Sequence, residues 1–394
     1  VKMSRKLKLY YRNCPSCRSD DYRLFYNNKN FEKIDALGKK YLIDKFYVTC
    51  KKCNLIYTNP TVKPSVYDKI YENTIIGSFR NIKNAKSNLK KLKYFSDLVN
   101  MSIIRNKKIL DIGCGQGELL QNISKKYKIS SKKIFAIEPS KKIYNYLKKN
   151  TSINVKNTFL DKLNKNNKYD FLILDNVFEH FDHPNKSLKK MSTILNENGY
   201  VYVSIPNALN PHFEYEDPLN HTCNYNKNNI VDLFAKNNFK VLKLITTDTL
   251  INFIATKQNS RITRISFSGD AKKNLLLQKK ILKNRRRLQK MHLKIKKCGD
   301  QIKKNRLKVV IFGSGNYSLE LLTKMNINKN VLGYIDSNRM YHGLVRNDYK
   351  VYSIQQLQNL KYDKIIIASN KYKMEIYSLL INRNINKEKI ILFN

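Results

Sequence analysis

The sequence predicts an α/β protein with two successive α/β units and a small cysteine-bearing ribbon in front of them. Apolar, β-branched runs alternate with helix-forming segments from about residue 107 to residue 256, and again from residue 308 onward. In each series the first strand runs into a glycine-rich turn, whereas two Cys-x-x-Cys pairs precede both series. Alternation of this kind implies mainly parallel sheets with helices on both faces.

Changes in composition divide the chain into four predicted segments. We expect a ribbon over residues 1–62 and an α/β domain with a helical lead-in over residues 63–256. Residues 257–306 are basic, helix-forming and poor in glycine, so we expect a connecting helix there. This helix would either connect the two domains within one subunit or pair with another subunit. Residues 307–394 then form the second α/β domain.

Short apolar runs mark the strands of both α/β domains. Each run is about as long as a buried strand and is rich in Ile, Val, Leu, Phe or Tyr. The clearest are residues 108–111, 134–137, 171–174 and 200–205 in the first domain, and 308–312, 331–335 and 364–368 in the second.

Length and composition exclude several classes of protein. A chain of 394 residues is too long for one ordinary core, and 42% hydrophobic residues are too many for a disordered protein. No run approaches the roughly 18 apolar residues of a membrane helix, and the basic N-terminus leads into no apolar stretch. Seven cysteines, an odd number, argue against a secreted disulfide framework, so we expect a cytoplasmic protein.

The formal net charge of +46 is the most unusual global property of the chain. A field of this sign attracts nucleic acid, anionic membranes or phosphorylated substrates. The lysines are spread along almost the whole chain, with the densest stretch at residues 272–308, and this spread favours a compositional bias as their origin. Whether the charge has a functional or a compositional origin, the positive field of the protein favours anionic substrates.

The two cysteine pairs predict a structural zinc site. Cys14 with Cys17, and Cys50 with Cys53, have the spacing at which a tight turn directs both thiolates at one ion. Four thiolates complete a tetrahedral shell and leave no position for a reacting water. Free thiols or a redox pair are the alternatives, but neither explains the presence of two pairs.

A cofactor site is predicted where the first strand of the central domain ends. The strand carries Asp111 and runs into Gly113, Gly115 and Gly117, after which a helix begins. Glycines let the backbone approach a ligand, and a helix N-terminus offers unpaired N–H groups. Asp111 suits a ligand with an amino group, and Glu138, which ends the next strand, is placed to accept hydrogen bonds from ribose hydroxyls.

These stretches, with the run from Tyr169 to Pro184 and the Pro206-Asn207 pair, resemble the motifs of class I S-adenosylmethionine-dependent methyltransferases, which have a Rossmann-like fold. The resemblance covers roughly residues 105–245. It implies that the methionine moiety is bordered by Asp111, Gly113, Cys114, Gly115 and Gly117. It also implies that Glu138 holds the ribose, that Asp161 lies near the adenine, and that Asp175 and Asn176 lie below the sulfonium.

Methyl transfer needs an aligned nucleophile and a group that removes its proton. His180 and His221 are the candidate bases, because each lies in a segment expected near the transferred methyl group. His180 could instead fix the loop beside the cofactor, and His221 could be a loop histidine without a proton to move.

The whole layout resembles the deoxysugar C-methyltransferases, which act on nucleotide-linked sugars and combine a zinc ribbon, a methyltransferase core and a Rossmann-like tail domain. The resemblance implies an anionic nucleotide-sugar as the acceptor. That family has a longer His-rich signature, of which this chain offers His221, with Glu214, Tyr215 and Glu216 before it and Tyr225 after it. Transfer to carbon, oxygen or nitrogen therefore stays open.

Other interpretations of the sequence remain. An RNA methyltransferase would use the basic surface and the ribbon, and a non-catalytic scaffold would only bind ligands through its two Rossmann-like units. The second glycine turn, Gly313 to Gly315 followed by Asp336, could bind a nucleotide or NAD, or could be purely structural.

Overall fold

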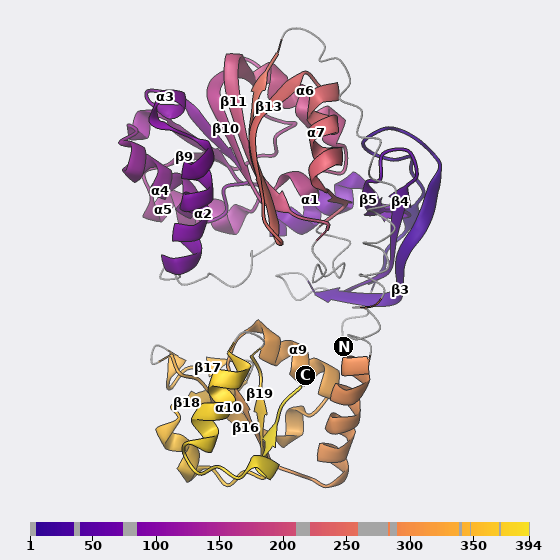
Figure 1. The fold of residues 1–394 in the computed structure, drawn as a ribbon, viewed down its shortest axis with the longest axis vertical. Helices are drawn as coiled ribbons and strands as arrows, with labels where there is room; N and C mark the ends of the chain where they lie inside the picture. The colour runs from indigo at the N-terminus through magenta and orange to yellow at the C-terminus, as the bar shows by residue number, and fades with distance from the viewer. Residues whose placement is uncertain are drawn as a thin grey trace. The chain divides into compact units, whose positions relative to one another are not determined.

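A computed structural model describes residues 5–34, 40–73, 85–209, 221–258, 283, 290–338, 341–346, 348–369 and 372–393 (Figure 1). The chain divides into two compact units, Val1–Gln278 and Lys279–Asn394.

Seven strands form the central sheet of the first unit, in the order β13-β14-β11-β10-β7-β8-β9 (Figure 1). The five strands from β11 to β9 in this order pair in parallel with one another, whereas β14 is antiparallel to both β11 and β13. The strand order reverses between β7 and β10, and ligands of open α/β sheets bind at the carboxyl ends of the strands at such a reversal. The strands are β7 (Ile109–Ile112), β8 (Ile134–Ile137), β9 (Asn154–Lys156), β10 (Tyr169–Asp175), β11 (Leu195–Pro206), β13 (Phe239–Thr246) and β14 (Leu250–Lys257).

Helices cover both faces of this sheet, and the alternation of side chains along β10 shows how. Phe171 and Ile173 belong to the core under α2, α4 and α5, whereas Leu172 and Leu174 belong to the core under α6 and α7. The predicted α/β architecture is thus confirmed for this domain. The helices are α1 (Pro64–Asn73), α2 (Ala85–Leu98), α3 (Met101–Ile104), α4 (Glu118–Tyr127), α5 (Lys141–Asn150), α6 (Pro184–Ile194) and α7 (Lys227–Lys236), with short η1 (Ser131–Lys133) and η2 (Phe178–His180).

The cysteine-bearing ribbon shares a sheet and a core with the α/β domain. Its strand β5 pairs with β12, which comes more than 160 residues later in the chain, through Tyr57 and Cys223. Val48 and Tyr57 lie in the same core cluster as Leu172 of the central sheet. Ribbon and α/β domain therefore fold as one unit. The strands are β1 (Arg5–Lys6), β2 (Leu9–Tyr10), β3 (Tyr22–Ile34), β4 (Lys40–Cys50), β5 (Ile56–Thr58), β6 (Thr61–Val62) and β12 (Cys223–Asn224).

A buried ion pair joins the ribbon to the loops of the α/β domain. The side chains of Arg12 and Asp182 are each only 8% exposed and form a salt bridge. The Arg12 guanidinium also donates hydrogen bonds to the carbonyl oxygens of Asp182 (3.0 Å), Thr58 (3.2 Å) and Thr222 (3.3 Å). Burial lowers the pKa of Arg12, but Asp182, together with smaller contributions from Cys223, Tyr67 and Tyr10, outweighs burial and leaves that pKa raised. The Arg12 guanidinium therefore keeps its charge although it is buried.

The second unit is a smaller α/β domain around a six-stranded sheet, in the order β17-β18-β16-β15-β19-β20 (Figure 1). All pairs are parallel except β17 with β18. This confirms the predicted second α/β domain. Its elements are β15 (Val309–Phe312), α9 (Asn316–Met325), η3 (Asn328–Asn330), β16 (Val331–Ile335), β17 (Val345–Arg346), β18 (Tyr349–Tyr352), η5 (Gln355–Asn359), β19 (Lys364–Ile367), α10 (Lys373–Ile381), η6 (Lys387–Lys389) and β20 (Ile390–Ile391).

The predicted connecting helix at 257–306 falls largely outside the described residues, which leave out 259–282 and 284–289. Its described end, residues 290–304, is helical and contributes Ile295 and Ile302 to the core of the second unit. Within the described part of the chain, no helix has both the length and the apolar character needed to cross a membrane.

Replacing Arg12 by Met should lower the free energy of unfolding of the first unit by about 3–5 kcal/mol, because it leaves the Asp182 carboxylate buried without its partner. The matched control is Lys51→Met, which removes an exposed ion pair with Asp21 and should cost less than about 1 kcal/mol. Urea unfolding of both variants, followed by circular dichroism, measures the difference. Equal losses would mean that the buried pair contributes no more than a surface pair.

Candidate functional site

The turn after β7 lies at the carboxyl end of the sheet, beside the strand-order reversal. Gly113 and Gly115 have positive φ angles of 68° and 53°, which side chains other than glycine rarely adopt. A Cβ on Gly113 would lie 2.8 Å from a methyl carbon of Val177, whereas one on Gly115 would meet nothing within 4 Å. Gly113 is therefore required for packing within the protein, whereas the open side of Gly115 is available to a ligand.

Glu138 fixes this turn from the end of β8. The side chain is buried, and its two oxygens accept hydrogen bonds from the backbone N–H groups of Gly115 (3.0 Å) and Ser140 (2.9 Å). Burial raises the pKa of Glu138, and the two N–H donors oppose that rise. A carboxylate offers about four lone-pair positions, so two remain for hydroxyl donors such as those of a ribose.

Asp111 and Asp175 place two carboxyl groups near the turn. Asp111 is 3% exposed, and burial together with the nearby Asp175 raises its pKa well above the usual value. Asp175, at the end of β10, forms a salt bridge of 2.5 Å with Lys91 of α2. A ligand with a positively charged amino group would relieve the electrostatic cost of burying Asp111.

The remaining predicted cofactor residues occupy different environments. Gly117 is the N-cap of α4, Cys114 is partly buried within the turn, and Asn176 directly follows β10 and donates a hydrogen bond to the Asp175 carboxylate (3.0 Å). Asp161 is exposed and lies near Asp68 of α1. The structure therefore brings all the predicted cofactor residues except Asp161 to the turn and the two strand ends beside it.

The two candidate bases are neighbours, although 41 residues separate them. The rings of His180 and His221 lie 5.0 Å apart in an edge-on arrangement. His180 Nδ1 lies 2.9 Å from the Tyr71 hydroxyl oxygen, and Glu179 is buried next to both histidines. The pKa of Glu179 is raised to about 8, mainly by burial and also by the charge of Asp175, whereas a backbone hydrogen bond and Lys91 oppose the rise.

Sequence reasoning missed three contributors to this site: Lys91, Tyr71 and Glu179. Lys91 and Tyr71 come from helices α2 and α1, and nothing in their local patterns marks them. Glu179 directly precedes the candidate base His180, so the sequence alone could have indicated an acid beside this histidine. Of the other expected residues around His221, Glu214, Tyr215 and Glu216 lie outside the described residues. Tyr225 is fully buried against Phe178.

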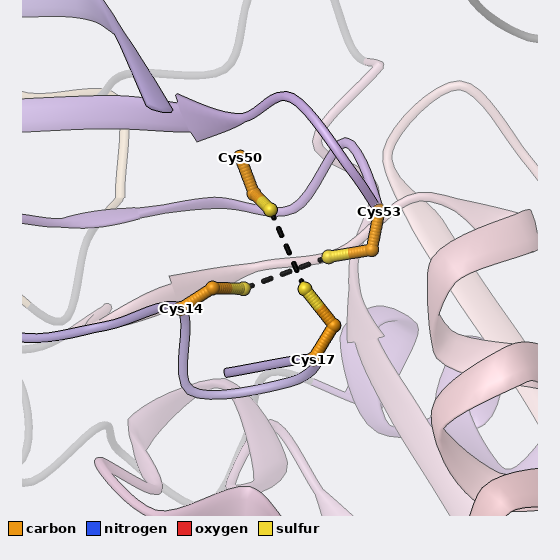
Figure 2. Close-up of side chains that lie close together, drawn as sticks. All are labelled: Cys14, Cys17, Cys50 and Cys53. Atoms are coloured by element: carbon orange, nitrogen blue, oxygen red, sulfur yellow. Dashed lines mark hydrogen bonds between the residues drawn. The ribbon is translucent and has the colours of Figure 1, made fainter. Parts of the chain in front are cut away.

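The four ribbon cysteines converge on one point from two matching turns (Figure 2). Cys14 and Cys53 sulfurs lie 3.5 Å apart, as do those of Cys17 and Cys50. Each turn closes with a backbone hydrogen bond to its first cysteine, from Arg18 (2.8 Å) or Asn54 (3.0 Å). Tetrahedral coordination at a Zn–S distance of 2.3 Å puts two sulfurs roughly 3.8 Å apart, so this cluster has the dimensions of a four-thiolate zinc site.

The second glycine turn is held in the same way as the first, by hydrogen bonds to a carboxylate from the neighbouring strand. Gly313 follows β15 with a φ of 105°, and Asp336, which follows β16, accepts hydrogen bonds from the backbone N–H (2.9 Å) and hydroxyl (2.6 Å) of Ser314. Arg346 donates to the Ser314 carbonyl (2.8 Å). In both units, an acidic side chain therefore holds a glycine turn: Glu138 after β8 holds the turn after β7, and Asp336 after β16 holds the turn after β15.

Comparison with known families agrees with the geometry of the first unit. Residues 82–244 match the family model described as a methyltransferase domain, and they span the glycine turn, Glu138 and the segment from Asp175 to His180. This region therefore matches a methyltransferase domain in sequence, and it has the Rossmann-like fold expected for one. Residues 305–391 match a second family model, described as the N-terminal domain of C2185-like proteins.

Solved structures similar to the α/β domain of the first unit include two methyltransferases. The plantazolicin methyltransferase BpumL is 16% identical, covers 45% of this chain and 88% of its own, and has a TM-score of 0.38. The 1,6-didemethyltoxoflavin-N1-methyltransferase of Burkholderia thailandensis is 10% identical, covers 53% of this chain and 98% of its own, and has a TM-score of 0.42. No curated protein sequence matches the chain.

Replacing Gly115 by Ala should weaken the binding of S-adenosylhomocysteine at least tenfold, because the new methyl group points to the open side of the turn. The positive φ angle would also cost about 1–2 kcal/mol of stability. Gly343→Ala is the matched control, since Gly343 has a φ of 81°, has nothing within 4 Å and lies in the second unit. Calorimetric titration measures both affinities. Equal affinities would contradict a ligand at Gly115.

Proposed function

We propose that this protein transfers a methyl group from S-adenosylmethionine to a sugar, either linked to a nucleotide or part of a surface polysaccharide. One observation supports this most directly: the buried Asp111, the open side of Gly115, and Glu138 meet at the strand-order reversal, and His180, which follows β10, lies next to His221.

The residues at the reversal fit the three charged or polar parts of S-adenosylmethionine. Asp111 and Asp175 would bind its positively charged end, and Lys91 would release Asp175 as that charge arrives. Gly115 would let the ligand pack against the backbone, and Glu138 would accept hydrogen bonds from the ribose. Asn176 would border the methyl group, and Asp161 would lie toward the adenine. When bound, the cofactor supplies an activated methyl group.

The protein's own task is then to position the acceptor and to take its proton. His180 or His221 would accept that proton as the acceptor attacks. Tyr71 fixes the orientation of His180 by the hydrogen bond at Nδ1, so the other ring nitrogen faces away from α1. The buried Glu179 would stabilise an imidazolium once it forms.

The sugar acceptor is supported by the layout of the chain and by its charge. A four-cysteine ribbon, a methyltransferase domain and a second α/β unit occur here in the order known from deoxysugar methyltransferases. The net charge of +46 favours a substrate that carries a diphosphate. Within the second unit, the turn at Gly313, held by Asp336, is a candidate nucleotide-binding site in its own right.

A structural Zn²⁺ in the ribbon is part of the proposal. All four sulfurs lie within 4.8 Å of one another, and the described cysteines form no disulfide. Zn²⁺ would neutralise thiolates that repel each other at this spacing. Binding would stabilise the ribbon and, through the core that it shares with the central sheet, the methyltransferase domain.

The acceptor is tested by titrating the zinc-loaded protein with S-adenosylhomocysteine, alone and with each of a panel of nucleotide-sugars. We expect micromolar binding that tightens with one nucleotide-sugar, and methyl transfer to that compound from S-adenosylmethionine. Binding of S-adenosylhomocysteine without transfer to any sugar would refute the sugar acceptor. Methyl incorporation into RNA, with an affinity that falls steeply with salt, would replace it by an RNA substrate.

Metal analysis of the purified chain tests the ribbon site. We expect one Zn²⁺ at the ribbon in the native chain and its loss in Cys53→Ser, together with a lower melting temperature of the first unit. Cys298→Ser is the control, because this cysteine lies in the second unit, outside the cluster. Retention of zinc by the Cys53 variant would rule out a four-thiolate site.

A further inference from the structure

A second group of potential metal ligands lies beyond the end of β10, away from the ribbon cysteines. Glu179 and His180 belong to η2, and His221 comes from the segment before β12. One donor atom of each residue, a carboxylate oxygen or an imidazole nitrogen, lies within 4.8 Å of the other two. Among the described residues, only this group and the ribbon cysteines have such an arrangement.

Glu179 is the unusual member of this group. The side chain is only 2% exposed, and within the described residues neither carboxylate oxygen has a hydrogen-bond partner. Its nearest basic atom is Nε2 of His180, at 4.0 Å from Oε1. Buried carboxylates are normally paired, hydrogen-bonded or bound to a metal ion, since an uncompensated buried charge is strongly unfavourable. The Glu179 carboxylate therefore lacks a counterpart at the point where the two imidazoles converge.

Tyr71 prepares His180 for coordination. In the neutral tautomer whose Nδ1–H donates to the Tyr71 hydroxyl, at 2.9 Å, Nε2 keeps its lone pair on the side of Glu179. Metal-binding histidines are typically oriented in this way, by a hydrogen bond from the ring nitrogen that does not bind the ion. The Tyr71 contact orients the ring and is compatible with the tautomer that a cation needs.

We infer that Glu179, His180 and His221 bind a first-row divalent cation, such as Mn²⁺, Fe²⁺, Co²⁺ or Zn²⁺, next to the methyl-transfer site. Two nitrogens and one carboxylate suit these ions, and three protein ligands leave coordination positions open. Ligands at about 2.1 Å from one ion lie roughly 3 to 4 Å from each other, so the 4.0 Å between Glu179 and His180 already falls in this range. The cation would neutralise the buried carboxylate.

This cation deepens the proposed function and, in its role, rests on it. The open coordination positions would bind a hydroxyl group of the acceptor and lower its pKa, so that the oxygen attacks the methyl carbon as an alkoxide. The C–S bond breaks with its electron pair going to sulfur, and the hydroxyl proton leaves to solvent. Both imidazoles would then serve as ligands, and the chemistry favours transfer to oxygen over transfer to carbon.

The test uses Mn²⁺ as the probe on the zinc-loaded full chain, because Mn²⁺ prefers oxygen and nitrogen ligands and competes poorly for thiolates. Free Mn²⁺ is followed by electron paramagnetic resonance during the titration. We expect one Mn²⁺ per chain, and affinity at least tenfold lower in Glu179→Gln and in His221→Ala. His183→Asn is the matched control, because this histidine follows the same segment but is 47% exposed and lies outside the group.

Binding of S-adenosylhomocysteine by each variant shows that the domain is folded and separates this inference from the proposed function. A chain that binds S-adenosylhomocysteine but no Mn²⁺ or Co²⁺ beyond the ribbon zinc would overturn the cation site and leave the methyltransferase intact. Mn²⁺ binding that both variants retain would also overturn it. Binding that only the two ligand variants lose would establish the site, whatever the acceptor proves to be.

Discussion

The geometry of the candidate active site depends on the buried ion pair between Arg12 and Asp182. One guanidinium, from the ribbon, donates to backbone carbonyls of Thr58, Asp182 and Thr222. Asp182 comes two residues after His180, and Thr222 comes directly after His221. Arg12 thus fixes the two loops that bring these histidines together. Because the pair is buried, its strength is little affected by salt, in contrast to a surface ion pair.

The strand-order reversal between β7 and β10 sets the second constraint. It gathers the ends of these strands and of β8 at one edge, where the chain places Asp111, Glu138 and Asp175. Three acids close together would repel each other, and the structure offsets this differently for each. Glu138 receives backbone N–H donors, Asp175 pairs with Lys91, and Asp111 keeps a raised pKa. A cationic ligand fits this arrangement electrostatically.

Local sequence patterns were enough to predict the fold class, because strands and glycine turns are encoded within a few residues. The turn at Gly113 to Gly117 and the paired cysteines are examples. The acids at the strand ends could also be found, since parallel strands bring their carboxyl ends to one edge. The contacts that complete the site could not be predicted from the sequence. Lys91 reaches Asp175 across 84 residues, Tyr71 reaches His180 across 109, and Arg12 reaches Asp182 across 170. Single lysines, tyrosines and arginines are too common in this chain for any one of them to be marked by its neighbours.

The pairing of β5 with β12 has a consequence for how this architecture is inherited. A domain that ends at a flexible linker can be exchanged between genes as a block, but here two residues of the methyltransferase domain complete a sheet of the ribbon. Removing the ribbon would expose the edge of β12 and uncover the core that Tyr57 fills. The ribbon and the methyltransferase domain could therefore be exchanged only together.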